Sequence, residues 1–533
     1  MDELPSKEGF PMDLRVVGRD EIAYEYAVQW FGQKYLDKVS DNLHRSSVTT
    51  EAIFEDLMKY DRKYVGPKVR SDPAYLAVLE SVREDFTSKE PLIPLTLGGV
   101  FEHPDFPRDK SPGLPWTQRG FKTKGDVLDC SESRGKILRL WDAIGNSRSN
   151  VGLPDSCTFF RAQIATTGKE KIRAVWGTPM DVVCEEFRFF KPYITWLEQT
   201  NAPIAYRVEM ATGGMSYIND MCRRHPNQPM VMTDYSQFDA SIPAWLIRDA
   251  FQIVFDSFDL TKVIGSDGKT WNVKPHRTNA RIRKLIQYFI NTPIRMPDGR
   301  RFRKSGGVPS GSVFTNIIDT IVNAIVMRYV SYHTTGNLPL AEMYLGDDSF
   351  LILRGIVNLK DMSELALESF GMIIHPEKSY VTTNPGNVQF LGYYNRGGLP
   401  FKPQAALVAS FIYPERRVMS NMIRVARALG QMWSTMHSGL AYNWFCMVQQ
   451  MMKDFEVSEQ DMTEYIESHP NHFRYLRMIG IDPKKVGIPR PSGNVILEVD
   501  PPWVSLRNYT PKTYDVQALY DKAVLRYNDR YQE

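Results

Sequence analysis

Short apolar runs that alternate with polar turns dominate the middle of the chain. Residues 229–259 and 305–395 switch between strand-like and helix-like patterns and form its most regular part. In the second block, the apolar runs at 341–345 and 349–353 flank Gly346-Asp347-Asp348. We predict a β-hairpin whose turn carries two adjacent carboxylates, a suitable ligand set for hard divalent cations. Asp and Gly are also ordinary turn formers, so the triplet alone does not establish a function.

The first regular block also ends in acidic residues. A strand at 230–233 runs into Asp234, and Asp239 follows five residues later. Ser241 is expected to cap a helix over 243–258. A carboxylate at the end of a buried strand is costly unless it is paired or metal-bound, which makes Asp234 a candidate ligand. We expect Asp239 to face the same space, although it could instead be an acid near the helix start.

A glycine-rich loop at 305–312, which contains Ser310 and Gly311, precedes a predicted helix over 313–332. Such loops allow the backbone to approach a ligand closely. The helix is mostly apolar, but polar residues recur at every fourth position: Thr315, Asp319 and Asn323. They therefore share one face and need partners. A nucleotide would supply these partners, and a solvated edge is the alternative.

Basic residues gather in three other places. Lys169, Lys171 and Arg173 alternate, so an extended strand would place three cations on one side, as a triphosphate requires. The turn Ser111-Pro112-Gly113-Leu114-Pro115-Trp116, followed by Lys122 and Lys124, would guide a nucleic-acid backbone or form a surface loop. Between 281 and 304 eight basic residues occur with one acid. That cluster is either a solvated face or a nucleic-acid contact.

Composition narrows the class of protein. The 533 residues are 43% hydrophobic and 24% charged with a net charge of +3, so a large core is feasible and charge alone does not indicate nucleic acid. Five scattered cysteines without Cys-x-x-Cys pairs argue against disulfides or zinc and fit a reducing compartment. The acidic N-terminus is not a secretory signal, and no apolar run approaches a membrane span. We expect a soluble intracellular protein.

The pattern also divides the chain. Residues 1–65 contain helix-like stretches at 21–36 and 50–60 and are expected to form an N-terminal extension. Residues 66–228 are predicted to be a loop-rich mixed region, and 260–304 a basic, loop-like insertion. From 414 onward the pattern is helical, and the tail from 501 is expected to be extended and then helical from about 516. These pieces indicate an α+β protein.

The motifs resemble those of a known family. Asp-x4-Asp at 234–239, Ser-Gly-x3-Thr at 310–315 and Gly-Asp-Asp at 346–348 occur in the order of motifs A, B and C of viral RNA-dependent RNA polymerases. Further resemblances are to motif F at 169–173, motif G at 111–115, motif D at 370–379 and motif E at 389–393. Motifs A and B are most similar to those of small double-stranded RNA viruses, picobirnaviruses above all.

One position departs from a common pattern. Many polymerases of positive-strand viruses have Asn four residues after the motif B Thr, where this chain has Asp319. Partitivirus-like enzymes use Asp similarly, which supports the double-stranded RNA assignment. The exact sugar contacts are left open, because a carboxylate accepts a hydrogen bond but does not donate one as an amide does.

The resemblance implies a right-hand fold. The palm would comprise 229–259 and 305–395, with an antiparallel sheet. The fingers would comprise 66–228 and 260–304 and would be closed. Residues 396–533 would form a helical thumb and the C-terminal tail.

It also implies an activity and its residues. Asp234 and Asp347 would bind two Mg²⁺ or Mn²⁺ ions, with Asp348 as a secondary ligand. The nucleotide would be bound by a larger set: Lys169, Lys171, Arg173, Asp239, Ser310, Gly311, Thr315 and Asp319. Within this set the cations would neutralise the triphosphate, while Asp239 would accept the 2′-hydroxyl. Lys378 would protonate pyrophosphate, and Ser111, Pro112, Gly113, Lys122 and Lys124 would contact RNA.

The expected partners follow from this activity. They are a single-stranded RNA template, the product duplex, ribonucleoside triphosphates and the viral capsid protein, with no membrane and a monomeric enzyme. The enzyme would act inside the capsid and in the host cytoplasm, with primer-independent initiation. A reverse transcriptase is the nearest rival, but Asp239 invites the 2′-hydroxyl that such enzymes block. The second alternative is a non-catalytic RNA-binding protein built on a decayed polymerase fold. The intact Asp234, Asp347 and Asp348 argue against it.

Overall fold

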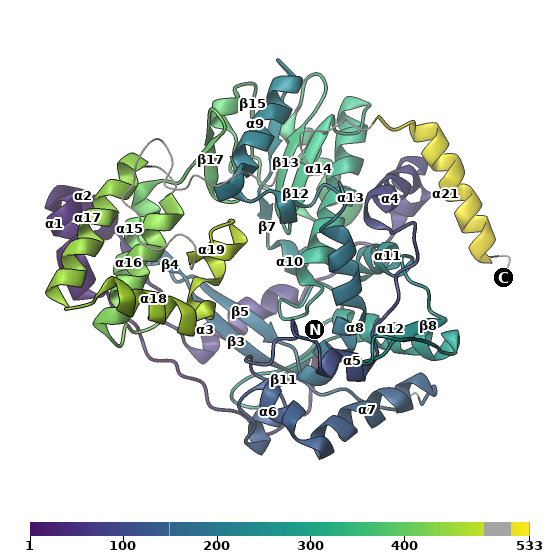
Figure 1. The fold of residues 1–533 in the computed structure, drawn as a ribbon. Coiled ribbons are helices and arrows are strands. Elements are labelled where there is room, and N and C mark those ends of the chain that lie inside the picture. The colour runs from purple at the N-terminus through teal and green to yellow at the C-terminus, as the bar shows by residue number, and fades with distance from the viewer. Residues whose placement is uncertain (149, 436–437, 484–512, 532–533) are drawn as a thin grey trace.

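The computed structural model describes residues 1–148, 150–435, 438–483 and 513–531. A four-stranded sheet lies at one end of the molecule, a five-stranded sheet lies at the other, and a helical unit lies to one side of both (Figure 1). In the described residues no helix is long and apolar enough to cross a membrane. All five cysteines are free thiols.

The four-stranded sheet has the order β12-β13-β6-β15, and each pair of neighbours is antiparallel. Its strands are β12 (Ala341–Leu345), β13 (Asp348–Ile352), β6 (Met230–Met232) and β15 (Tyr380–Thr382). Leu345 pairs with Asp348 across the hairpin, which confirms the predicted β12–β13 hairpin around Gly346. Because β6 and most of β13 are buried, these short strands form part of the core.

Two helices from the regular blocks are buried against other elements. They are α11 (Ala244–Phe255) and α13 (Thr315–Thr335), and α13 contacts β12, α14 (Leu359–Phe370) and α4 (Pro73–Phe86). The predicted Ser241 cap is wrong. Ser241 instead ends the short α10 (Phe238–Ser241) and donates to the carbonyl of Phe238, while Pro243 occupies the N-cap of α11.

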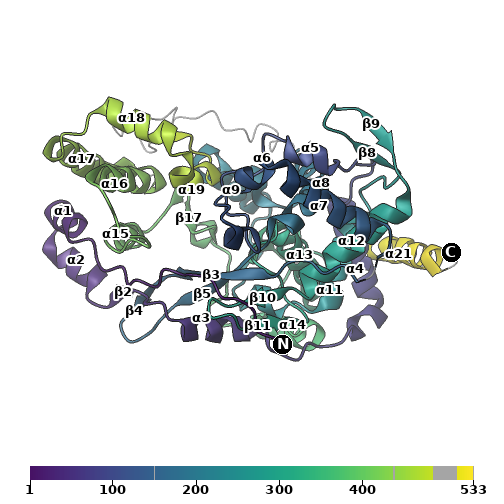
Figure 2. The same cartoon turned by 90° about the horizontal axis from the view of Figure 1, so that it is seen from below.

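The five-stranded sheet has the order β1-β11-β10-β3-β5. Its strands are β1 (Asp2–Leu4), β11 (Arg301–Arg303), β10 (Pro293–Arg295), β3 (Ser156–Ala162) and β5 (Ile172–Gly177). Nearby, α12 (Pro275–Ile290) lies beside α7 (Ser131–Gly145) and α8 (Met180–Leu197) (Figure 2).

These helices correct two predictions. Residues 66–228 are rich in helix rather than loop, because they contain α4, α7, α8 and α9 (Gly214–Arg224). The segment 260–304 is not loop-like, because α12 spans 16 of its residues. Its buried positions include Ile282, Leu285 and Phe289, while basic residues on other positions obscured the apolar face in the sequence.

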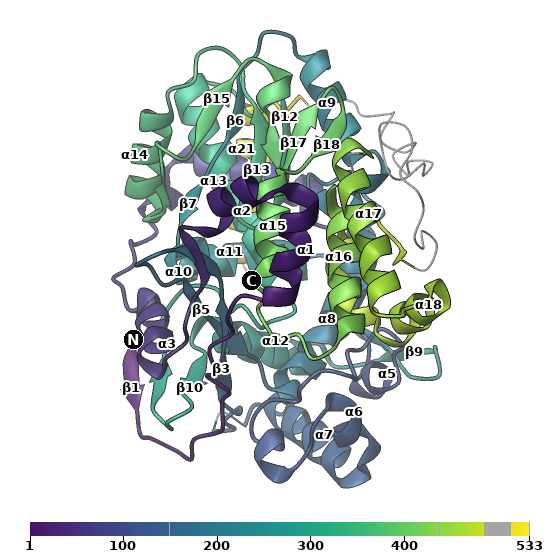
Figure 3. The same ribbon diagram turned by 90° about the vertical axis from the view of Figure 1, so that its left-hand side faces the viewer.

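The helical unit contains α15 (Gln404–Ile412), α16 (Asn421–Thr435), α17 (Ser438–Asp454) and α18 (Glu459–Ser468). Two N-terminal helices, α1 (Glu21–Phe31) and α2 (Gln33–Ser40), pack against this unit (Figure 3). The next helix, α3 (Thr50–Leu57), packs on β5, and β1 pairs with β11. The first 65 residues therefore join the five-stranded sheet to the helical unit.

The C-terminal helix α21 (Val516–Tyr531) confirms the predicted helix at the end of the tail. It packs on α4, on the side of the molecule away from α15–α18 (Figure 1). Ion pairs join Arg526 to Glu80 and Lys522 to Glu84. Residues 501–512, expected to be extended, lie outside the described residues.

A buried arginine joins the elements behind the acidic hairpin. Arg328 on α13 is 2% exposed; its Nη2 donates to Asp85 on α4 over 2.5 Å and its Nε to Glu342 on β12 over 2.9 Å. The hydroxyl of Tyr514, just before α21, also donates to Asp85 over 3.0 Å. The two carboxylates thus compensate one cation at a site where water cannot.

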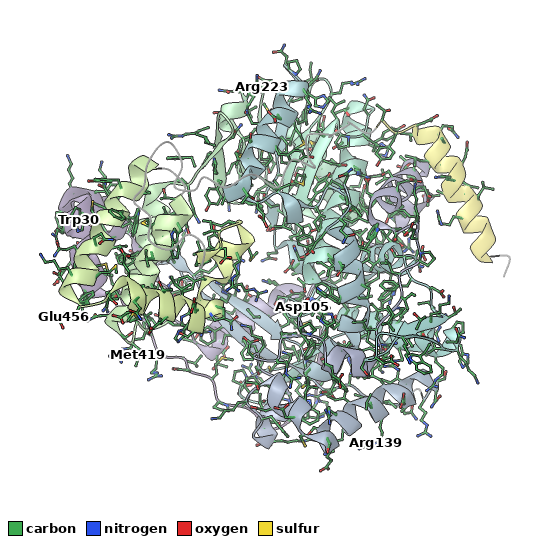
Figure 4. The ribbon with its side chains drawn as sticks, in the orientation of Figure 1. Trp30, Asp105, Arg139, Arg223, Met419 and Glu456 are labelled. Atoms are coloured by element: carbon green, nitrogen blue, oxygen red, sulfur yellow. The ribbon has the colours of Figure 1, made fainter. Side chains whose placement is uncertain are left out.

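Replacing Arg328 should therefore be costly. We expect Arg328→Met to lower the free energy of unfolding by about 3–5 kcal/mol, because Asp85 and Glu342 lose their buried counter-charge. Thermal or urea unfolding of the purified protein measures the change. Arg139→Met, at a surface position (Figure 4), is the matched control and should change the free energy by less than about 0.5 kcal/mol. Equal effects of the two substitutions would contradict this role.

A second buried charge lies where α8 meets the loop before α13. Glu186 on α8 is 3% exposed and accepts a hydrogen bond from the Ser312 hydroxyl. Burial raises the pKa of Glu186 to about 7, from an ordinary value of 4.5. The folded protein therefore binds this proton more tightly than the unfolded chain does, and its stability falls as the pH rises through this window.

Glu186→Gln should remove that pH dependence. From pH 4.5 to above pH 7 the variant should gain stability relative to the parent by up to about 3 kcal/mol, because the amide never ionises. Unfolding free energies at pH 5, 6 and 8 measure the difference between the two proteins. An offset that is constant with pH would show that Glu186 does not titrate in this range.

Candidate active site

The strand register brings the two acidic turns together. Phe350 of β13 pairs with Met232 of β6, and continuing that antiparallel register by two residues places Asp348 opposite Asp234. Gly346, at the tip of the neighbouring turn, has φ of +60°, a conformation that favours glycine. Pairing of the apolar strands thus places Asp234 near Asp347 and Asp348, more than a hundred positions later in the sequence, at one edge of the sheet.

Helix α13 holds the Gly346 turn through three hydrogen bonds. The Gly346 N–H donates to Oγ1 of Thr320 over 2.9 Å. Nδ2 of Asn323 donates to the carbonyls of Gly346 and Asp348 over 3.0 and 3.2 Å. Oδ1 of Asn323 accepts from the Tyr235 hydroxyl over 3.0 Å. The predicted nucleotide partner of Asn323 is therefore wrong, because protein groups satisfy this side chain.

The Asp234 turn is held from the other side. Its N–H donates to the hydroxyl of Ser379 and its carbonyl accepts from the His375 N–H, both over 2.8 Å. Ser379 is buried, whereas Lys378, one residue earlier, is exposed. The segment that resembles motif D therefore fixes the backbone of Asp234 and places Lys378 next to that anchor.

Negative charge accumulates at this edge. Shielding from water raises the pKa of Asp347, and the nearby Asp239 and Asp234 raise it further, although Arg173 opposes them. Burial and the charges of Asp347 and Asp234 raise the pKa of Asp348 to about 6. The N–H of Leu391, in the segment that resembles motif E, donates to Oδ2 of Asp348 over 2.9 Å and partly offsets this.

Asp319 on α13 is part of the same group of acids. Burial raises its pKa well above the usual range, and Asp239, hydrogen-bonded to it, raises it further. Its side chain is buried, and its Oδ1 has no hydrogen-bond partner among the described residues. Asp319 thus has an unused polar atom beside the acidic turns.

The donor chemistry of these acids fits divalent cations. Carboxylate oxygens are the ligands that Mg²⁺ and Mn²⁺ prefer, and carboxylates that raise one another's pKa values gain from a cation between them. Asp234 and Asp347 both reach solvent, although neighbouring groups partly shield Asp347. Within the described ranges, no three Asp, Glu, His or Cys side chains are already arranged as a metal cage. The fit therefore rests on charge and donor type.

The glycine-rich loop is joined to β5. Oγ of Ser310 accepts from the Trp176 N–H over 3.0 Å, and a Cβ on Gly311 would lie 1.6 Å from the Trp176 carbonyl oxygen. Oγ1 of Thr315 donates to the carbonyls of Pro309 and Ser312 over 2.7 and 2.9 Å. These three residues therefore shape the loop, and the hydroxyl proton of Thr315 is already used within it.

The cationic segment departs from its predicted form. Strand β5 begins at Ile172, so only Arg173 lies in it, and the prediction of three cations along one strand face is wrong. The chain turns before Lys169, where Gly168 has φ of +83°. All three side chains are exposed, and the charge of Arg173 acts on Asp347.

The segment expected to guide RNA is partly buried. Ser111 and Lys122 are exposed, whereas Pro112, Gly113 and Lys124 are buried. Nζ of Lys124 donates to the Ser111 carbonyl over 2.7 Å, and burial lowers the pKa of Lys124 to about 8. Burial of Lys124 contradicts its predicted contact with RNA, because its ammonium group braces the turn from inside.

Several residues that hold the site were not predicted as site residues: Thr320, Asn323, Ser379 and Leu391. Asn323 was visible only as part of the polar stripe. Thr320 and Ser379 look like ordinary small polar residues in the sequence, and Leu391 acts through its backbone. No local pattern could have identified these three.

Comparisons with known proteins agree with this geometry. The family described as viral RNA-dependent RNA polymerase matches residues 20–435. The RNA-directed RNA polymerase of Cryptosporidium parvum virus 1 (strain KSU-1) is 31% identical over 291 residues, 52% of this chain and 50% of that protein. That of White clover cryptic virus 1 is 26% identical over 278 residues, 49% and 45% of the two chains. The chain thus matches about half the length of these curated relatives.

Solved structures show the fold. The crystal structure of the RNA-dependent RNA polymerase of a human picobirnavirus has a TM-score of 0.62 at 14% identity, covering 89% of this chain and 90% of that one. An insertion-loop deletion mutant of such a polymerase has a TM-score of 0.63, with 89% and 94% covered. The predicted right-hand fold and the resemblance to polymerases of double-stranded RNA viruses are confirmed. The chain belongs to the family of viral RNA-dependent RNA polymerases.

Proposed function

We propose that this protein is an RNA-directed RNA polymerase that replicates and transcribes a viral double-stranded RNA genome. The observation that carries the proposal is the pairing of β13 with β6, which brings Asp347 and Asp348 within electrostatic reach of Asp234, in a chain that matches this family over residues 20–435. The substrates would be a single-stranded RNA template and ribonucleoside triphosphates, with a duplex as product. Synthesis would begin without a primer.

The acids would have different roles in binding two Mg²⁺ or Mn²⁺ ions. Asp234 and Asp347 would bind both ions, since their side chains are exposed at the edge. Asp348 would be a secondary ligand, because Oδ2 already accepts from Leu391. The ions, when bound, would activate the 3′-hydroxyl for attack on the α-phosphorus and stabilise the leaving pyrophosphate.

The exposed cations would receive the triphosphate. Arg173 lies within electrostatic reach of Asp347, and Lys169 and Lys171 precede it on the same segment. Their positive charge would offset the negative charge of the phosphates. Lys378, exposed beside the residue that anchors Asp234, would protonate the pyrophosphate.

Asp319 and Asp239 would recognise the ribose. The burial that raises the pKa of Asp319 favours its protonated form, which both donates and accepts hydrogen bonds. A protonated Asp319 would therefore do what an amide does at this position. With Asp239 as acceptor, the pair would bind the 2′-hydroxyl and select ribonucleotides over deoxyribonucleotides.

The biological setting extends the proposal. The viral capsid protein would be a partner, and a monomeric enzyme would act inside the capsid and in the host cytoplasm. In this proposal protein carboxylates hold the ions and protein cations hold the substrate, so the enzyme would not need a membrane.

The purified chain should synthesise RNA on a single-stranded template without a primer. Labelled product should form from ribonucleotides with Mg²⁺ or Mn²⁺ and should disappear when EDTA removes the ions. Asp347→Ala should abolish synthesis, whereas Asp348→Asn should retain it with about a 10–100-fold loss, as expected for an outer ligand. Product only from deoxyribonucleotides would indicate a reverse transcriptase. No product from the parent under any of these conditions would leave only an RNA-binding protein.

Substitution of Asp319 tests the ribose argument. Asp319→Asn should keep the preference for ribonucleotides within about threefold, whereas Asp319→Leu should lower it at least about tenfold, the value of one hydrogen bond. Competition between each ribonucleotide and its deoxy analogue measures the ratio of kcat/KM values. If Asp319→Leu discriminates as well as the parent, Asp319 does not contact the ribose.

A further inference from the structure

The basic cluster at 281–304 separates into two groups in the structure. Arg281 pairs with buried Glu185, Arg300 pairs with Asp298, and Nζ of buried Lys304 donates to backbone carbonyls. These cations are neutralised or used inside the protein. Arg283, Lys284 and Arg303 have no carboxylate partner among the described residues, and of these three Lys284 and Arg303 line a common cavity.

Both side chains line a cavity of about 660 Å³ between α12, β10–β11 and the Leu114–Pro115 turn. One face of α12 supplies the residues at i, i+3 and i+4, Lys284, Gln287 and Tyr288, and the C-cap residue Asn291 follows them. The apolar part of the wall comes from Leu114, Pro115, Leu153, Pro154 and Pro293. The cavity therefore combines an apolar wall with polar groups from one helix.

Positive charge exceeds negative charge around this cavity. Five cations line it: Lys7, Lys284, Arg295, Arg301 and Arg303. Among the described residues that line it, the single carboxylate is Asp155, which both Arg295 and Arg301 contact. Burial lowers the pKa of Lys284, and the nearby Arg303 lowers it further, as expected for two cations without an anion between them. An anionic ligand would relieve this repulsion.

We infer that this cavity is a second nucleotide site, in which Lys7, Lys284 and Arg303 hold a phosphate while the apolar wall receives the base. Its volume falls in the range of small-molecule sites, roughly 300–1,000 Å³, and exceeds what inorganic phosphate needs. Gln287 has no side-chain partner among the described residues, so its amide is available to a base edge.

The site is separate from the acidic turns. None of Asp234, Asp239, Asp319, Asp347 and Asp348 lines the cavity. In Figure 1 the elements that build it, α12 and β11, lie below the β12–β13 hairpin, toward the five-stranded sheet. The phosphate-bearing nucleotide could be part of an RNA strand or a free triphosphate, and the two sources share the chemistry that this cavity recognises.

Binding in EDTA tests the inference without any synthesis. Without cations the acidic turns repel phosphate, so failure to bind would not bear on polymerase activity. The probes are a labelled 5′-phosphorylated RNA dinucleotide and labelled GTP, each by equilibrium dialysis at several salt concentrations. Lys284→Gln/Arg303→Gln should weaken binding of at least one probe about tenfold or more. It should also reduce the slope of log affinity against log salt by about 1–2, because two phosphate contacts are lost.

The neighbouring Arg283→Gln is the matched control, since Arg283 is exposed on the same helix and does not line the cavity. Its affinity should stay within about twofold of the parent. Thermal unfolding checks that each variant is folded. If the double variant is unstable, Lys284→Gln alone replaces it in the binding experiment. Loss of RNA binding alone identifies a strand site, and loss of GTP binding identifies a free-nucleotide site. Unchanged binding of both probes by the double variant would overturn the inference.

Crosslinking locates the bound nucleotide. A 5′-phosphorylated dinucleotide that carries 4-thiouridine should label peptides from residues 275–291 or 113–116, and the double variant should lose that labelling. Labelling confined to other peptides would overturn the proposed site even if the double variant binds more weakly.

Discussion

Mutual repulsion among five carboxylates is the constraint on which the site depends: Asp234, Asp239, Asp319, Asp347 and Asp348. Folding the apolar strands forces them together, because burying β6 and β13 in antiparallel register places both acidic turns at one edge. Burial is the largest cause of the raised pKa values at Asp319, Asp347 and Asp348, and the charges of the neighbouring acids raise them further. The ions proposed above would relieve this repulsion, and their binding would therefore stabilise the fold.

Several elements around the acids hold the backbone, whereas the Leu391 N–H and Arg173 partly offset the charges of Asp348 and Asp347. Thr320 and Asn323 bind the Gly346 turn, Ser379 binds the Asp234 N–H, and the Leu391 N–H binds Asp348. These contacts come from α13 and from two segments further along the chain. They fix the turns while leaving the side chains of Asp234 and Asp347 exposed to a ligand. Rigid turns with free carboxylates are what a preorganised ion site needs.

The sequence predicted those parts of the site that are encoded locally. The β12–β13 hairpin and α13 follow from apolar periodicity, and the order of the acids follows from motif spacing. The partners of Thr315 and Asn323 did not follow, because tertiary contacts from the loop and the hairpin satisfy them. Lys169 and Lys171 alternate with Arg173 in the sequence, but a turn keeps them off the strand. Helix α12 was missed because its polar face is crowded with basic residues.

At Asp319, burial raises the pKa more than the charges of the neighbouring acids do. Divalent ions at Asp234 and Asp347 would reduce the negative potential around the acids, and this alone would lower the pKa of Asp319. The largest cause of its raised pKa is burial, which ions at the exposed edge do not remove. The unpaired Oδ1 stays within the same enclosed space. In the proposed ribose contact an acid would therefore take the place of an amide, because burial favours its protonated form.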